Sequence, residues 1–189
     1  ALITRDEFGK VLEEHKMLTG QDPWLHCTAP FGMDFAYLDI HKDTGLFLEV
    51  YNEDRTGGIP ADFKVPDQKF EGPIDTQFAK FLQIGILVDD VQKCIKEFEK
   101  YGVGPWRVSD FDTEGIDGFV MNGVENAHLH TIMAFCDIWG FEIELIQPIS
   151  ESPYKEWHDE HGNGMHHIAL ITRDSFEDVL AEHKAHTGR

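Results

Sequence analysis

Four polar side chains occupy matching places in two related parts of this chain, and together their types suit a divalent metal ion. Gln83 and Glu144 lie in the first and last expected strands of one part, and His167 and Glu49 lie in the corresponding strands of the other. An amide oxygen, two carboxylates and an imidazole suit a divalent ion in octahedral geometry, with room for water. We therefore predict one metal ion held by these four residues.

Two neighbouring residues compete with members of this set. In the expected strand 141–147, Glu142 and Glu144 point to the same face because side chains alternate along a strand. His166 directly precedes His167 and competes with it as the histidine ligand. Only the alignment of repeated segments favours Glu144 and His167, so both alternatives stay open at the level of sequence.

The alignment rests on a segment that occurs twice. Residues 1–20 and 169–188 are identical at 14 of 20 aligned positions, so one strand-helix unit is present near both ends. Apolar residues at 3.6-residue spacing predict an amphipathic helix in each copy. A diverged copy begins at residue 81 and places Gln83 opposite His167.

Strand and turn signals follow each helix, so the repeated module has the order β-α-β-β-β. The expected helix N-caps are Asp6, Asp174, and Asp89 or Asp90, and the expected C-caps are Gly20 and Gly188. The strands expected after the helices are 24–28, 35–39 and 46–51 in the first unit, and 118–121, 127–135 and 141–147 in the middle unit.

Composition excludes several classes of function. The net charge of −19 argues against nucleic acid and anionic membranes as partners, because these require a basic surface. No apolar run reaches the length of a membrane span. The three cysteines lack a CxxC spacing, which disfavours a disulfide framework and a zinc site made of cysteines alone, and favours the reducing cytoplasm.

Several stretches together resemble the vicinal oxygen chelate superfamily, which comprises glyoxalases, bleomycin resistance proteins and dioxygenases. The resemblance is closest to glyoxalase I and methylmalonyl-CoA epimerase-like members, and covers most of the chain apart from the linker. It is carried by LQIGILVDDV, GVGPW, FEIELIQP and HGNGMHHIALIT in that order, and by FAYLDIHKDTGLFLEVYN near the beginning.

This resemblance implies an α+β fold in which paired βαβββ modules form a curved, open mixed sheet around a metal cleft. The implied metal ligands are again Gln83, Glu144, His167 and Glu49, with Glu49 as the catalytic base and Glu144 as the second acid or base. The cofactor would be one divalent ion, with Zn, Ni, Co, Mn and Mg not distinguished. No other bound cofactor is implied.

The order of the modules differs from that usual in the family. We expect a second-type module over 1–52 that lacks the His-bearing start of its first strand, a linker over 53–80, and a first-type module over 81–148. Residues 149–189 would then hold a connector and the strand and helix that start a further second-type module. The chain is therefore either permuted or part of a tandem array.

The duplicated ends compete for one place beside the strands of 24–51. We expect the N-terminal copy to stay with its own module, since its docking closes the shorter loop. The C-terminal copy would then join a second chain, giving a homo-oligomer with an exchanged segment. The alternative is that 165–188 folds back and closes the site within one chain.

The implied function is proton transfer next to a carbonyl, through an enediolate or enolate held at the metal. This would be a glyoxalase I-like lyase or isomerase step, or a 2-acyl-CoA epimerisation, on a small-molecule substrate. Two alternatives are a resistance-type protein that binds a small molecule without catalysis, and an Fe(II) extradiol dioxygenase. The latter is disfavoured by Gln83, which replaces a histidine ligand.

Overall fold

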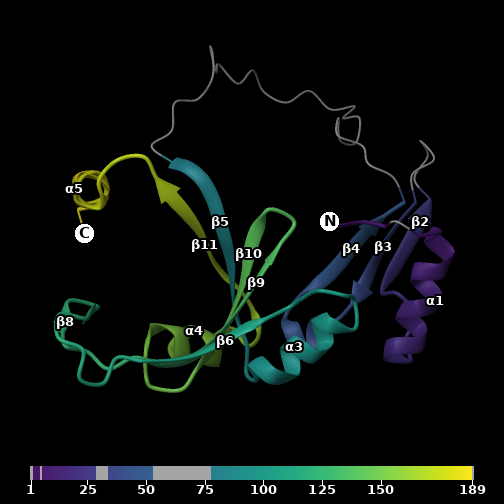
Figure 1. The fold of residues 1–189 in the computed structure, drawn as a ribbon, viewed down its shortest axis with the longest axis horizontal. Coiled ribbons are helices and arrows are strands. Elements are labelled where there is room, and N and C mark those ends of the chain that lie inside the picture. Colours follow the sequence, from purple (N-terminus) through teal and green to yellow (C-terminus); the bar gives the residue numbers. More distant parts are fainter. Residues whose placement is uncertain (1, 5, 29–33, 53–77, 189) are drawn as a thin grey trace, which may run out of the picture.

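The computed structural model describes residues 2–4, 6–28, 34–52 and 78–188, which form two open sheets, a two-stranded ribbon and the helices that connect or follow the strands (Figure 1). The expected linker lies almost wholly outside the described residues. The first sheet has the strand order β1-β4-β3-β2, in which β1 and β4 run parallel and the other pairs antiparallel. Its strands are Leu2–Ile3 (β1), Leu25–Thr28 (β2), Asp34–Asp39 (β3) and Phe47–Tyr51 (β4). Helix α1, Phe8–Thr19, joins β1 to β2.

The second sheet has the order β11-β5-β10-β9-β6. Strands β5 and β10 pair in parallel, whereas β11 and β5 are antiparallel. The strands are Phe78–Leu87 (β5), Arg107–Asp112 (β6), His130–Ile138 (β9), Phe141–Pro148 (β10) and Gly164–Thr172 (β11). The helices of this part are Val91–Glu99 (α3), Pro153–His161 (α4) and Phe176–Thr187 (α5). The predicted α+β class with open mixed sheets is confirmed.

The main core forms where α3 lies against the second sheet. The apolar stripe of α3 buries Val91, Cys94 and Phe98 against the strands, as its 3.6-residue spacing predicts. Asp90 caps this helix by accepting a hydrogen bond from the Lys93 amide at 3.0 Å. The first sheet joins the same core through Ile40 and through the partly buried Leu46 and Leu48. One end of the first sheet is therefore anchored on the second.

The middle module differs from the sequence expectation in its second strand. Residues 118–121 were expected to fill that place, but β7 (Val120–Met121) pairs with β8 (Val124–Glu125) in a separate two-stranded ribbon. The second strand is β6, which pairs along the edge of β9. Every residue of β6 except Phe111 is exposed, so no alternating apolar pattern marks the strand in the sequence.

The expected helix ends are partly right. Gly20 and Gly188 end α1 and α5 in the left-handed conformation, with φ of 76° and 74°. The expected caps Asp6 and Asp174 are wrong by one residue, since Glu7 and Ser175 hold the cap positions. The expected turn after β3 closes as a single helical turn, α2 (His41–Thr44). Among the described residues, no helix combines the length and the apolar character needed to cross a bilayer.

The two copies of the repeated segment have different surroundings. In the N-terminal copy, β1 pairs with β4, and the apolar residues of α1 pack on the cluster of Ala36, Leu38 and Val50. In the C-terminal copy, β11 pairs with β5 and α5 buries no residue. Phe176 on α5 is 67% exposed, although its equivalent Phe8 packs on that cluster. Burial here depends on position in the fold, because the two sequences are nearly the same.

His15 on α1 is a buried titratable residue in the contact between the N-terminal helix and the middle module. Its side chain is fully buried, and Nδ1 lies 2.7 Å from the Tyr101 hydroxyl. Burial lowers the pKa of His15 below 6.5, against the opposing charges of Asp39, Glu97 and Asp22. The neutral imidazole is therefore favoured in the folded state, and its contribution to stability is complete above pH 6.5 and is lost as the pH falls towards the lowered value.

We expect the melting temperature of the metal-free protein to fall between about pH 7 and about pH 5, and His15→Phe to reduce this fall. Thermal unfolding followed by circular dichroism measures the effect. His183→Phe is the matched control, because His183 holds the equivalent place on the exposed helix α5. Equal pH dependence in the wild type and in His15→Phe would show that His15 is not the responsible group.

Candidate functional site

Three of the four predicted site residues meet on neighbouring strands of the second sheet. Gln83 comes from β5, Glu144 from β10 and His167 from β11. Nε2 of Gln83 donates a hydrogen bond to Oε2 of Glu144 at 2.6 Å, and Nε2 of His167 lies 3.3 Å from the same oxygen. Glu144 is only 7% exposed. A buried carboxylate thus has an amide on one side and an imidazole on the other.

A glycine makes this arrangement sterically possible. Gly85 stands opposite both Glu144 on β10 and His167 on β11, so it occupies the middle of the cluster. A Cβ at this position would lie 2.1 Å from Cε1 of the His167 ring. The imidazole therefore lies directly over the backbone of β5, and only the absence of a side chain permits it to approach Glu144.

The sequence neighbours His166 and Glu142 make contacts that differ from those of His167 and Glu144, although Nδ1 of His166 also lies 3.1 Å from Nδ1 of His167. The His166 ring packs edge-on against Tyr154 and Trp157, and burial together with the neighbouring His167 lowers its pKa. Glu142 instead pairs with Arg107 at 2.8 Å. His167 and Glu144, the residues favoured by the repeat, are the ones that meet Gln83.

Glu49 lies on β4 of the first sheet, where its contacts are with tyrosines. The Tyr51 hydroxyl donates a hydrogen bond to it at 2.8 Å, and this bond raises the pKa of Tyr51 to about 12. A hydrogen bond to Glu49 likewise raises the pKa of Tyr37. The fourth predicted residue therefore lies in the first sheet, with tyrosines as its partners, and not in the cluster that joins the other three.

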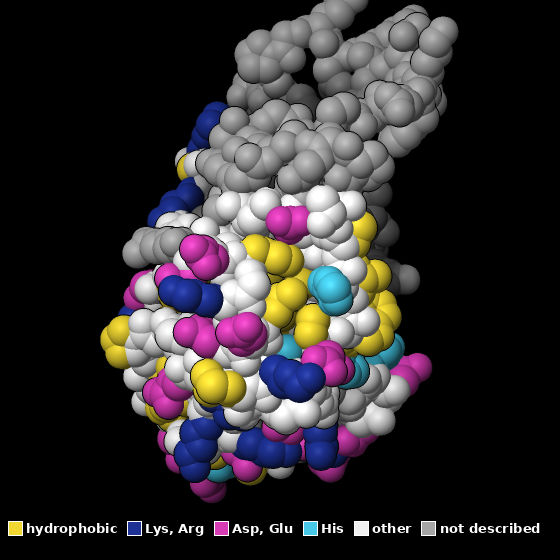
Figure 2. All heavy atoms as spheres, turned by 90° about the vertical axis from the view of Figure 1, so that its right-hand side faces the viewer, with side chains coloured by type: hydrophobic (Ala, Val, Ile, Leu, Met, Phe, Trp, Pro, Cys, Tyr) yellow, Lys and Arg dark blue, Asp and Glu magenta, His cyan; other side chains and the backbone are white. Residues whose placement is uncertain are grey.

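The surface beside Glu49 is aromatic. The Trp24 ring packs against Tyr37 and Phe47, with centroid distances of 6.0 and 5.1 Å. Seen from the side of α1 and β2, hydrophobic side chains gather beside a histidine, among acidic and basic groups (Figure 2). Exposed apolar residues of this part include Met17, Leu18, Trp24 and Leu25.

The donor set around Glu144 partly fits a divalent metal ion. A glutamine oxygen, a carboxylate and an imidazole nitrogen are all suitable ligands, and the Gln83 amide can turn to present its oxygen. Among the described residues, no three His, Cys, Asp or Glu side chains are placed to hold a metal. The cluster itself offers two such groups and an amide. A further carboxylate would complete the predicted set.

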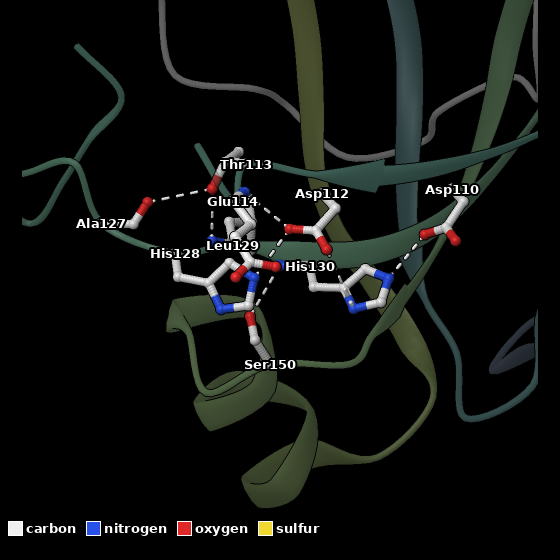
Figure 3. A network of polar contacts seen from close by, with 9 residues as sticks. All are labelled: Asp110, Asp112, Thr113, Glu114, Ala127, His128, Leu129, His130 and Ser150. Atoms are coloured by element: carbon white, nitrogen blue, oxygen red, sulfur yellow. Dashed lines mark hydrogen bonds and ion pairs between the residues drawn. The ribbon is translucent and has the colours of Figure 1, made fainter. Parts of the chain in front are cut away.

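A second polar network lies at the edge formed by β6 and β9 (Figure 3). His130 Nε2 lies 2.7 Å from Asp110, and His128 Nε2 lies 2.9 Å from Asp112. The amide of Glu114 and His128 both help to lower the pKa of Asp112. These histidines share no spacing in the sequence that would have located the network, and β6, which supplies both aspartates, lacks an alternating apolar pattern. Nδ1 of His130 also lies 4.0 Å from Asp112, so the two histidines share this carboxylate.

We expect Gly85→Ala to weaken metal binding at the cluster by about 10–100-fold, the size of effect typical when a ligand loses its support. The added methyl group must displace the His167 ring, which then loses its approach to Glu144. Isothermal titration with Co²⁺ measures the change. Gly9→Ala on α1 is the control, because a Cβ there meets nothing within 4 Å. Unchanged affinity in Gly85→Ala would exclude His167 as a ligand in this position.

Several solved structures are similar to parts of this chain. Among solved structures, a hypothetical protein from Bacillus halodurans C-125 is 25% identical, with a TM-score of 0.43 over 57% of this chain and 68% of that one. Methylmalonyl-CoA epimerase from Mycobacterium tuberculosis is 16% identical, with a TM-score of 0.41 over 62% and 70% of the two chains. A Streptomyces coelicolor methylmalonyl-CoA epimerase variant is 20% identical, with a TM-score of 0.41 over 58% and 73%.

No curated protein matches the chain. A family model described as Glyoxalase/Bleomycin resistance protein/Dioxygenase superfamily matches residues 82–189, which is more than half of the sequence. This match includes β10, β11 and the three clustered residues. The family expected from the sequence is thereby confirmed. The chain belongs to the glyoxalase, bleomycin resistance protein and dioxygenase superfamily.

Proposed function

We propose that this chain catalyses metal-dependent proton transfer at a carbon next to a carbonyl group. The observation that supports this most is the buried carboxylate of Glu144, which lies between the amide of Gln83 and the imidazole of His167. One divalent ion would be held by these three residues, with Glu49 as the fourth ligand. The reaction would be a glyoxalase I-like lyase or isomerase step, or an epimerisation of a 2-acyl-CoA ester.

Each residue of the cluster has a distinct task in this proposal. When bound, the metal would act as a Lewis acid that stabilises negative charge on the substrate oxygen. Gln83 fixes one oxygen of Glu144 through its amide hydrogen bond, which sets the orientation of the carboxylate. Glu144 can then take up or return a proton at its carboxylate oxygen. His167 holds its imidazole against the same carboxylate and gives the cluster a nitrogen donor.

The basic side chain of Arg107 bears on the choice between the two substrate classes. Arg107 lies opposite Phe135 on the same sheet, and its guanidinium is bound by Asp137 and Glu142. Because two carboxylates compensate its charge, Arg107 is a weak candidate for binding a phosphate group. Hemithioacetals of 2-oxoaldehydes and 2-acyl-CoA esters are therefore the two substrate classes to compare, with the smaller class favoured.

Metal stoichiometry together with proton exchange tests this function. We expect one Co²⁺, Ni²⁺ or Zn²⁺ per chain, and exchange of the substrate α-proton with deuterated water, followed by NMR. His167→Ala should lose both metal binding and α-proton exchange. His128→Ala, in the network at the edge of β6 and β9, should keep metal binding and α-proton exchange. Full metal binding by His167→Ala, or a metal-loaded protein that exchanges no proton in either substrate class, would refute the proposal.

A further inference from the structure

The exposed copy of the repeated segment carries the same contact residues as the buried copy. On α1, the residues Phe8, Val11 and Leu12 pack on the cluster of the first sheet, and His15 bonds Tyr101. Helix α5 repeats these side chains in the same order as Phe176, Val179, Leu180 and His183. Phe176 and Leu180 are 67% and 51% exposed. The surface that α1 covers is therefore equally suited to α5.

The strands of the two copies also match. Residues Leu2 and Ile3 of β1 pair in parallel with Val50 and Tyr51 of β4. Their equivalents in β11 are Leu170 and Ile171. Strand β1 has only two residues that can pair with β4, whereas β11 has nine residues and could form a longer ladder. Among the described residues, β11 has only β5 as a ladder partner, so its other edge is open to pairing.

Transferring the β1 register to β11 brings Glu49 to the cluster. If Leu170 takes the place of Leu2 opposite Val50, then Ala169 stands opposite Glu49, and His167 lies two residues before it. In the middle module, Glu144 stands opposite Gly85, and Gln83 lies two residues before that glycine. In the transferred register, His167 would therefore have the same position relative to Glu49 that Gln83 has relative to Glu144. The side chains of Gln83 and Glu144 are 2.6 Å apart.

The starts of β4 and β11 already touch within one chain. Gly45 lies two residues before the first residue of β4, and a Cβ there would lie 2.4 Å from backbone atoms of Asn163 and Gly164, where β11 begins. The transferred register would place Gly45 opposite Met165, one residue from the observed contact. Asn163 is fixed by hydrogen bonds with Asp89 at 2.8 and 3.1 Å. The two strands thus diverge from a common, anchored point.

We propose that the chain has a second conformation in which β11 and α5 replace β1 and α1 on β4 of the same chain. The occupant of the open β11 edge is then β4 itself, and Glu49 joins Gln83, Glu144 and His167. This inference rests on the proposed function in one respect, because a metal ion that binds all four residues would favour the second conformation. Pairing within one chain is favoured because the strand starts are already in contact, which lowers the entropy of closure.

Amide hydrogen exchange of the unmodified chain, with and without Co²⁺, measures which copy is docked. We expect saturating Co²⁺ to raise the protection of 176–187 and to lower that of 8–19, each by at least about tenfold. Calorimetry on the same samples reports whether Co²⁺ binds. An absence of binding would count against the proposed metal function. Binding without any exchange of protection would overturn the second conformation and leave the metal function intact.

Cross-linking then tests which strands are adjacent. In a Cys27→Ser background, Asn52→Cys is combined with Thr172→Cys, with Thr4→Cys, or with Thr187→Cys as the distant control. A short bifunctional methanethiosulfonate reagent, gel electrophoresis and peptide mapping identify the products. With Co²⁺, the 52–172 pair should cross-link within one chain roughly tenfold more than the 52–187 control. Products joining 52 and 172 of different chains would overturn the intrachain form, as would a 52–172 yield no higher than the control.

Discussion

Glu144→Gln is expected to lose at least about 10²-fold in metal affinity, because even changes to groups that merely support a ligand typically cost 10–100-fold. The glutamine keeps the shape of the side chain and can still accept the hydrogen bond from Gln83, so the fold should remain. What is lost is the negative charge between the amide and the imidazole. Titration with Co²⁺ followed by calorimetry measures the affinity, and the α-proton exchange assay should report loss of turnover.

Glu142→Gln is the matched control for this variant. It lies two residues away on β10 and pairs with Arg107 rather than with the cluster. It should keep metal affinity and proton exchange close to those of the wild type. If Glu142→Gln loses metal while Glu144→Gln keeps it, the ligand assignment on β10 is reversed.

Glu49→Gln is expected to lower the rate of proton transfer by about 10²–10⁴-fold, the typical cost of removing a general base. The change preserves the size of the side chain and its capacity to accept a hydrogen bond from Tyr51, so the first sheet should stay folded. The rate of α-proton exchange is measured at saturating metal, with metal content determined on the same samples. Glu125→Gln, on the exposed strand β8, is the control and should leave the rate unchanged.

This result also depends on the position of β4. With β4 paired to β1, Glu49 belongs to a different sheet from Gln83, Glu144 and His167. A large rate loss in Glu49→Gln would therefore support the conformation in which β4 pairs with β11. Normal turnover in this variant, with a full metal complement, would assign the base to Glu144 alone.

The sequence alone was sufficient for the features that depend on local pattern. The 3.6-residue spacing of Val91, Cys94 and Phe98 predicted α3, and Gly20 and Gly188 predicted the ends of α1 and α5. Internal repetition was the strongest signal, because it related Gln83 to His167 without any structural information. The repeat also selected His167 over His166 and Glu144 over Glu142, and these are the residues that the structure brings to Gln83.

Strand β6 was missed because it lacks a local signal. Its two apolar residues, Val108 and Phe111, are three positions apart and so do not follow a period of two, and nearly all of its residues are exposed at the edge of the sheet. It is a strand because β9 supplies hydrogen-bond partners from Arg107 to Asp112. Such pairing joins residues that are far apart in the chain, and it does not require an alternating apolar pattern within β6.

Only the tertiary structure decided which copy of the repeat is buried and where Glu49 lies. Residues 1–20 and 169–188 are identical at 14 of 20 positions, yet α1 packs on the first sheet and α5 buries no residue. Likewise, the alternation of β4 sets the face on which Glu49 stands, but not the strand that it faces. The physical reason is that a strand-helix unit specifies its own shape and apolar stripe, whereas burial and ligand grouping depend on which edge it pairs with. That choice is made by long-range contacts, which the local sequence of the unit does not specify.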